Sequence, residues 1–222
     1  MKKVLAVAVH PDDETLGCGG ALLKHKNDGD DIYWLIITSM HVEDGWTAER
    51  IESRREEINQ VSEMYGFTAT HCLDFPSTRL DTIVMKDLIA EISKIIQEVE
   101  PNLIYVPNRS DIHTDHQVAF KAIMSSTKTF RCSFIKKVLM CECPSETEFS
   151  PALPVDAFIP NVFVDITGFL EKKIKIMKMY RDEMGIFPFP RSEENIRALA
   201  RNRGTVVGAE TAEAFVLLRE VL

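Results

Sequence analysis

The chain has 222 residues, of which 45% are hydrophobic and 27% are charged, and its formal net charge is −8. This composition is typical of a globular protein with a sizeable buried core and excludes a largely disordered chain. The negative charge argues against broad binding to nucleic acid or to an anionic membrane surface, because either would require a basic face.

Apolar segments bounded by turn residues alternate with segments of helical periodicity along the first two-thirds of the chain. This alternation predicts an α/β fold in which a mostly parallel central sheet is flanked by helices. The length fits one domain over residues 1–222. The predicted strands are Val4–Val9, Ile32–Thr38, Thr70–Phe75, Leu103–Pro107, Lys137–Glu142 and Asn161–Ile166. The predicted helices between them are Thr15–Lys26, Trp46–Tyr65, Lys86–Val99 and His116–Ser125.

The last third of the chain has a different pattern. Residues 144–161 are rich in proline and polar residues, which predicts a long loop. Residues 166–184 carry apolar side chains at helical intervals, which predicts one amphipathic helix packed on the sheet. The methionines of this helix are interpreted as core residues.

The opening apolar run ends at His10 and Pro11, so it is too short for a secretory signal, and no segment is long enough for a membrane helix. The five cysteines are odd in number and irregularly spaced, which favours reduced thiols over a disulfide framework. Cys141 and Cys143 lack a second pair at zinc-site spacing and are interpreted as structural. We therefore expect a cytoplasmic protein.

The first chemical motif is His-Pro-Asp-Asp-Glu, residues 10–14, which directly follows an apolar strand. Ligand sites of open parallel sheets lie beyond the carboxyl ends of the strands, where this motif is expected. One interpretation is a helix cap, because acids at a helix N-terminus interact favourably with the helix dipole. The alternative is a divalent metal site, since imidazole and carboxylate are common zinc ligands and a cap needs no histidine.

A second cluster, His113, Asp115 and His116, follows another apolar strand. The chain has only six histidines, so two beside an acid at a second strand end favour a metal site shared with the first motif. A metal-bound water has its pKa lowered from 15.7 to about 7, but attack on a carbonyl also needs a base and an oxyanion donor. If His10, Asp13 and His116 bind zinc, Asp12 and His113 are left over near the metal. Asp12 would then be the base, and His113, held by Asp115, could donate to the oxyanion. The predicted chemistry is metal-assisted hydrolysis.

The chain also resembles the LmbE-like or PIG-L family of zinc-dependent N-deacetylases. The matching motifs span nearly the whole chain: HPDDE (10–14), TLGCGG (15–20), SRREE (53–57), LDFPSTRL (73–80), HTDH (113–116), VDITGFLEKK (164–173) and RNRGTVVGAETAEAF (201–215). The resemblance implies a Rossmann-like three-layer fold. It also implies one zinc ion, or another divalent transition metal, and removal of an acetyl group from an amino sugar of the N-acetylglucosamine type.

In the family pattern, the first histidine and second aspartate of the opening motif bind zinc together with the last histidine of the later motif. The first aspartate is the base, and the remaining histidine and acid of the later motif polarise and tune the oxyanion. The resemblance therefore implies these roles for His10, Asp13 and His116 as ligands, Asp12 as base, and His113 with Asp115 at the oxyanion. Thr114 replaces a frequent proline, which is expected to change loop stiffness but not the chemistry.

Four further residues could lie at or near the predicted site. Arg54 matches a family arginine that contacts substrate, although it could simply pair with a glutamate on its helix. Arg79 could reach a sugar or phosphate, or brace its own turn. Glu14 is expected to support the metal ligands from behind. His41 follows the second strand and could line the same cleft.

Two functions are alternatives to a zinc hydrolase: a binding module and a magnesium phosphohydrolase. A non-catalytic nucleotide- or sugar-binding module would use the acids only as caps, but Gly17, Gly19 and Gly20 lack the G-x-G-x-x-G spacing of a dinucleotide site. These glycines are expected to let the first helix approach the sheet or the metal loop. A magnesium phosphohydrolase is disfavoured because magnesium prefers oxygen ligands. The expected partner is a small amino-sugar conjugate, with no nucleic acid and no membrane span, and a homo-oligomer is left open.

Overall fold

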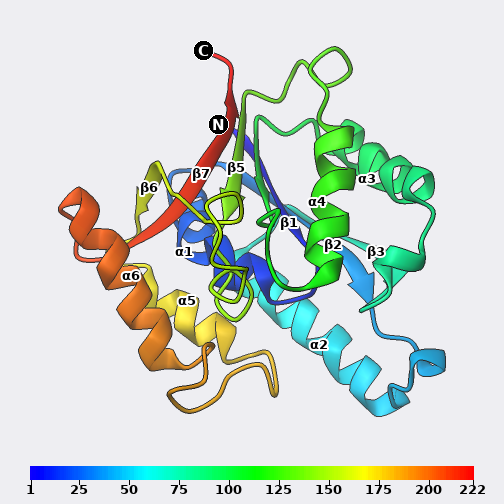
Figure 1. Ribbon diagram of the computed structural model, residues 1–222, viewed down its shortest axis with the longest axis horizontal. Helices are drawn as coiled ribbons and strands as arrows, with labels where there is room; N and C mark the ends of the chain where they lie inside the picture. Colours follow the sequence, from blue (N-terminus) through cyan, green and yellow to red (C-terminus); the bar gives the residue numbers. More distant parts are fainter.

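The computed structural model describes residues 1–222 and contains one seven-stranded sheet with the strand order β3-β2-β1-β4-β5-β7-β6 (Figure 1). The first five strands pair in parallel, and β7 runs antiparallel to both of its neighbours. The predicted α/β fold with a mostly parallel sheet is therefore confirmed. The strands are β1 Lys3–Ala8, β2 Asp31–Ser39, β3 Ala69–Pro76, β4 Leu103–Val106, β5 Lys137–Cys141, β6 Val162–Asp165 and β7 Ala212–Glu220.

Helices cover both faces of the sheet, so the molecule has three layers (Figure 1). Alternate residues of β1 point to opposite faces: Val4 and Ala6 pack with one core, and Leu5 and Val7 with the other. The first core is closed by α1 (Asp13–Asn27), α2 (Ala48–Tyr65), α5 (Leu170–Met177) and α6 (Glu193–Val207). The second core is closed by α3 (Met85–Val99) and α4 (Thr114–Ser126).

The first helix, α1, is kinked at Cys18, where the backbone leaves helical geometry. The second half of the helix begins there, and its free amides at Gly20 and Ala21 donate to the buried Glu213 carboxylate of β7 at 2.8 and 2.7 Å. Lys173 of α5 pairs with the same carboxylate at 2.7 Å. A Cβ atom on Gly20 would lie 2.7 Å from Ile166, so the expected close approach of a glycine to the sheet is confirmed.

The C-terminal third differs from the prediction. The amphipathic helix expected over residues 166–184 is wrong in length, because α5 ends at Met177 and the chain then turns, with Asp182 in a left-handed conformation at φ 66°. Helix α6 and strand β7 were not predicted. Strand β7 lies between β5 and β6 and pairs antiparallel with both. None of the helices is long and apolar enough to cross a membrane.

Candidate active site

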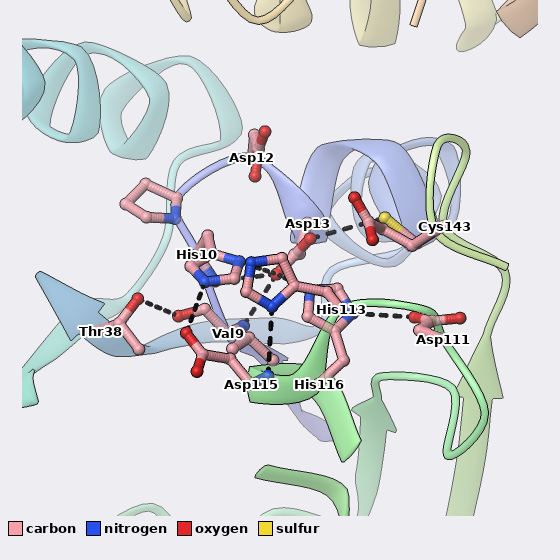
Figure 2. Close-up of polar contacts among 12 residues, drawn as sticks. Val9, His10, Asp12, Asp13, Thr38, Asp111, His113, Asp115, His116 and Cys143 are labelled. Atoms are coloured by element: carbon pink, nitrogen blue, oxygen red, sulfur yellow. Dashed lines mark hydrogen bonds and ion pairs between the residues drawn. The ribbon is translucent and has the colours of Figure 1, made fainter. Parts of the chain in front are cut away.

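The two predicted motifs meet at the topological switch point of the sheet. Strand β1 lies between β2 and β4, so the connections from these strands leave in opposite directions and open a crevice at their carboxyl ends. The segment after β1 supplies His10 and Asp13, and the segment from β4 into α4 supplies Asp111, His113 and His116 (Figure 2). The fold therefore brings together two short segments that are far apart in the sequence.

Two groups of side chains have ligand atoms within 4.8 Å of one another: His10, Asp13 and His116, and His10, His113 and Asp115. In the first group, Nε2 of His116 lies 3.3 Å from Oδ2 of Asp13, and Nδ1 of His10 lies 3.8 Å from the same oxygen. Two imidazole nitrogens and a carboxylate are the ligand types of a zinc site with a position left for water.

Two buried carboxylates hold the other nitrogen of each ring in this group. Oδ2 of Asp111 lies 2.8 Å from Nδ1 of His116, and Oδ2 of Asp115 lies 3.1 Å from Nε2 of His10. Both carboxylates are fully buried. A histidine that binds a metal commonly donates its other ring N–H to a carboxylate, which fixes the tautomer and the orientation of the ring. The surroundings of His10, Asp13 and His116 thus fit a metal ion.

The second group fits a metal less well because of His113. Its Nδ1 accepts the backbone N–H of Asp115 at 3.1 Å, so a neutral ring carries its proton on Nε2 and has no free lone pair. Burial, with His10 and His116 nearby, lowers the pKa of His113 to about 4. His113 is therefore a neutral N–H donor beside the ligand group, with ring centroids 4.5 Å apart from His10.

The expectation that Asp115 holds the His113 side chain is wrong. Its carboxylate accepts hydrogen bonds from His10 and from the backbone N–H groups of Thr78, at 2.6 Å, and Leu80, at 3.0 Å. Only the backbone of Asp115 contacts His113. The short helical turn that begins α4 explains this difference, because it directs the carboxylate back toward the β1 segment.

The acids of the first motif have separate environments. Burial opposes ionisation of Asp13, but His116 and His10 hold its pKa well below the usual range, and the backbone N–H groups of Val9 and His10 donate to its Oδ2. Asp12 occupies the N-cap position of α1 without a side-chain cap hydrogen bond. The helix-cap interpretation is therefore wrong for Asp12.

Asp12 is buried and only 4% exposed, and its Oδ2 accepts a hydrogen bond from Arg191 at 2.7 Å. Burial and the nearby Asp13 raise the pKa of Asp12, whereas Arg191 acts in the opposite direction. Its backbone φ is 142°, which is a rare value for a residue other than glycine. Figure 2 shows Asp12 at the start of α1, apart from the imidazole rings.

Glu14 lies behind Asp12 and is almost fully buried. Its carboxylate accepts hydrogen bonds from the Asp12 backbone at 3.2 Å, from Tyr180 at 2.7 Å and from the Thr15 hydroxyl. Burial raises the pKa of Glu14 to about 7. Glu14 thus braces the turn that carries Asp12 and Asp13 and does not contact the imidazoles.

The two arginines expected at the substrate are both paired. Arg54 is buried, donates to the Pro11 carbonyl at 2.9 Å and pairs with Glu183. The alternative that Arg54 pairs with a glutamate on its own helix is confirmed, since its Nε lies 3.3 Å from Glu57, but the side chain is buried and not solvated. Its guanidinium also holds the loop of the first motif. Arg79 is half-exposed and pairs with Asp44.

His41 lies at the carboxyl edge of the same sheet but outside the ligand groups. Its Nε2 contacts Ser39 at 2.8 Å and Asp74 at 2.9 Å. The hydrogen bond with Asp74 raises the pKa of His41.

Three residues that contact the site were not identified from the sequence. Asp111 could have been, because a buried carboxylate is expected behind each metal-binding histidine and this acid stands close to His116. Cys143 was interpreted as structural, yet its Sγ lies 3.5 Å from Oδ1 of Asp13. Arg191 has no local signal, since it comes from the distant segment between α5 and α6.

Residues 5–127 match the PIG-L family, described as GlcNAc-PI de-N-acetylase. The chain is 27% identical over 223 residues to the diacetylchitobiose deacetylase of Thermococcus kodakarensis, a match that covers 97% of this chain and 82% of that one. Among solved structures, the N,N'-diacetylchitobiose deacetylase of Pyrococcus horikoshii superimposes with a TM-score of 0.78 at 20% identity, covering 98% of this chain and 84% of that one. The 4-carboxy-2-hydroxymuconate hydratase GalB of Pseudomonas putida superimposes with a TM-score of 0.73 at 19% identity, covering 100% and 98%. Because one fold is shared by a deacetylase and a hydratase, the fold alone does not determine the reaction, and the side chains of the site do.

Proposed function

Because this chain belongs to the PIG-L family of de-N-acetylases, we propose that it is a zinc-dependent hydrolase that removes the N-acetyl group from an N-acetylglucosamine-type sugar conjugate. The products are acetate and a free amine. One observation carries the proposal: the two imidazoles that face Asp13 each have a buried carboxylate on their opposite nitrogen. This arrangement suits metal ligation and is not required by a sugar-binding module.

We assign one zinc ion per chain to His10, Asp13 and His116. Zinc in such a site activates water near neutral pH and polarises a carbonyl as a Lewis acid. Asp111 holds Nδ1 of His116 and Asp115 holds Nε2 of His10, so the other nitrogen of each ring is turned toward Asp13. His116 and His10 in turn keep Asp13 ionised. Another divalent transition metal would suit the same nitrogen and oxygen donors.

Two residues are assigned to proton transfer and charge stabilisation. Asp12 takes a proton from the attacking water and passes it to the leaving amine, using Oδ1, because Oδ2 is engaged by Arg191. His113 donates its Nε2–H to the oxyanion that forms at the acetyl carbonyl, a role supported by its fixed tautomer and its lowered pKa of about 4. A neutral donor of this kind needs no change of protonation before the reaction.

The substrate class is inferred from the deacetylase relatives and from the acetyl chemistry of the site. We also propose that residues 1–222 act as one catalytic domain, because both ligand segments leave the same sheet. A cytoplasmic location is proposed on the five free cysteines, which suit a reducing compartment.

Metal content and amine release from an N-acetylglucosamine conjugate, measured on the wild type, Asp12→Ala and His116→Ala, test the proposal. We expect stoichiometric zinc and turnover in the wild type, metal without turnover in Asp12→Ala, and loss of both in His116→Ala. Full activity in Asp12→Ala would refute the base assignment. A panel of conjugates with different aglycones, scored by fluorescent detection of the released amine, identifies the preferred substrate.

The rival function is a non-catalytic sugar- or nucleotide-binding module. It predicts no stoichiometric zinc and ligand binding that is unaffected by Asp12→Asn. Buried carboxylates behind two facing imidazoles are unexplained by that function, so the hydrolase is preferred.

A further inference from the structure

Arg191 lies in the segment between α5 and α6 and contacts the first motif from outside. Its Nη1 donates to Oδ2 of Asp12 at 2.7 Å and to Glu183 at 2.8 Å, and its Nε donates to the Ser145 hydroxyl at 2.7 Å. Its Nη2 lies 3.3 Å from Glu146. The guanidinium is therefore held on three sides, and one of its partners is the acid that the proposed function uses as a base.

Asp12 needs such a contact because its backbone is strained. A φ of 142° is unfavourable for a residue with a Cβ and persists only where the surroundings enforce it. Three contacts enforce it here: Arg54 binds the preceding carbonyl of Pro11, Glu14 accepts the Asp12 N–H, and Arg191 binds the side chain. Of these three, only Arg191 acts on the carboxylate itself.

We propose that Arg191 is a positioning residue for the deacetylation, which fixes the direction of the Asp12 carboxylate by occupying Oδ2 and leaving Oδ1 for the proton of the attacking water. This inference rests on the proposed function, in which Asp12 is the base. Arg191 itself does not contact the reacting atoms. A rigid planar guanidinium suits this role better than a flexible ammonium group, because its donors have a fixed geometry.

The position of Arg191 is itself set by a chain of ion pairs. Glu183 bridges Arg191 and Arg54, and Arg54 also pairs with Glu57 on α2. The segment between α5 and α6 is thus tied to the α2 surface and to the loop of the first motif at once. The same chain explains why Arg54 is buried and paired at a place where a substrate contact was expected.

A purely stabilising role makes a different prediction. One guanidinium is shared by the carboxylates of Asp12, Glu183 and Glu146, so its removal leaves these charges without a partner and lowers stability in either role. A stabilising role predicts that replacing Arg191 changes the melting temperature and leaves the turnover number of the folded enzyme unchanged. A positioning role predicts a lower turnover number in the folded enzyme, because a misplacement of about 1 Å can lower a rate by about 100-fold.

The test compares Arg191→Gln, Arg191→Lys and Asp12→Asn with Arg197→Gln as a matched control. Arg197 is also bound by two glutamates, Glu171 and Glu193, but it lies on α6 and contacts no site residue. For each variant, kcat, KM, bound zinc and the melting temperature are measured, and Arg191→Ala is assayed with and without added guanidinium.

We expect Arg191→Gln to lower kcat of the folded enzyme by about 10- to 100-fold while KM and bound zinc stay close to those of the wild type. Its melting temperature should also fall, because Asp12 loses its buried partner. Arg191→Lys should recover part of the lost kcat, and added guanidinium should recover part of it in Arg191→Ala. The double variant Asp12→Asn/Arg191→Gln should be no slower than Asp12→Asn alone. An inactive Asp12→Asn beside an Arg191→Gln variant with wild-type kcat would overturn this inference alone. An Asp12→Asn variant as active as the wild type would overturn the base assignment, and the positioning role with it.

Discussion

Oδ2 of Asp111 lies 2.8 Å from Nδ1 of His116, and the opposite nitrogen of this ring lies 3.3 Å from Asp13. His10 is held in the reverse sense, with Asp115 on its Nε2 and Asp13 nearer its Nδ1. The two rings thus present different nitrogens to the same carboxylate. This difference follows from their positions, since His10 leaves the end of β1 and His116 projects from the first turn of α4.

Replacing Asp111 tests whether its contact serves the metal. We expect Asp111→Asn to weaken zinc affinity by about 10- to 100-fold, because the amide cannot hold the His116 ring as a carboxylate does. Competition with a chromophoric chelator measures the affinity directly. The exposed acid Asp81 supplies the control, and an affinity unchanged in Asp111→Asn would show that the His116–Asp111 contact is irrelevant to metal binding.

His113 offers a prediction that separates donor from ligand. We expect His113→Ala to keep bound zinc but to lower kcat by about 100- to 1,000-fold, the usual effect of removing one oxyanion donor. Metal analysis and steady-state kinetics on the same preparation provide the two readouts. Loss of zinc in this variant would instead favour the alternative ligand group of His10, His113 and Asp115.

The grouping of His10, Asp13 and His116 was accessible from the sequence because both motifs are local. Each motif follows a strand end, and parallel strands bring their carboxyl ends to one edge of the sheet. The contacts that orient these ligands were less accessible. Asp115 was assigned to the nearest histidine in the chain, but its side chain turns to His10 across the crevice. Arg191 reaches Asp12 only through the tertiary fold.

In the fold, too, local patterns were predicted better than contacts between distant segments. Strands β1 to β6 were predicted within one residue at each end, because they are apolar runs between turns. Strand β7 and helix α6 were not predicted, although Ser192 and Gly208 are cap residues at the two ends of α6 and residues 215–218 of β7 are an apolar run. Strand β7 fills the space between β5 and β6 with antiparallel pairing, which no local pattern in residues 212–220 indicates.

The contact of Glu213 with the kinked helix predicts a large effect on stability. Glu213 accepts two backbone amides of α1 and pairs with the buried Lys173, so Glu213→Ala leaves a buried charge and two donors without a partner. We expect the free energy of unfolding to fall by about 3–5 kcal/mol, measured by urea denaturation. Glu193→Ala, which removes more exposed pairs with Lys178 and Arg197, should cost much less. Equal losses of unfolding free energy in Glu213→Ala and Glu193→Ala would contradict the stabilising role of Glu213.

The His41–Asp74 contact predicts a residue-specific titration. The hydrogen bond that His41 donates to Asp74 raises the pKa of His41, and the hydrogen bonds that Asp74 accepts from Ser39 and His41 lower the pKa of Asp74. The contribution from His41 is present below its unfolded pKa of about 6.5 and is lost as the pH rises through its raised folded pKa. The contribution from Asp74 is present above its unfolded pKa of about 3.9 and is lost as the pH falls through its lowered folded pKa.

The pair therefore stabilises the fold between these limits, by only a few tenths of a kcal/mol because the Asp74 side chain is 87% exposed. Titration of His41 by NMR should give a pKa above 6.5 in the wild type and a lower value in Asp74→Asn. Asp28→Asn, at the end of α1, is the control. A His41 pKa that does not respond to Asp74→Asn would show that the contact is not formed in solution.

The paired arginines of the site predict a preference for substrates without phosphate. Arg54 and Arg191 share Glu183, and Arg79 is bound by Asp44, so the arginines that border the site are neutralised within the protein. A phosphate beside the acetylated sugar would instead be repelled by the excess of carboxylates around Arg191, namely Asp12, Glu146 and Glu183. We expect an uncharged N-acetylglucosaminide to exceed the matched phosphate-bearing sugar by at least about tenfold in kcat/KM, with the gap narrowing as salt screens the repulsion. Equal kcat/KM values at low ionic strength would mean that one of these arginines leaves its carboxylate to bind the phosphate.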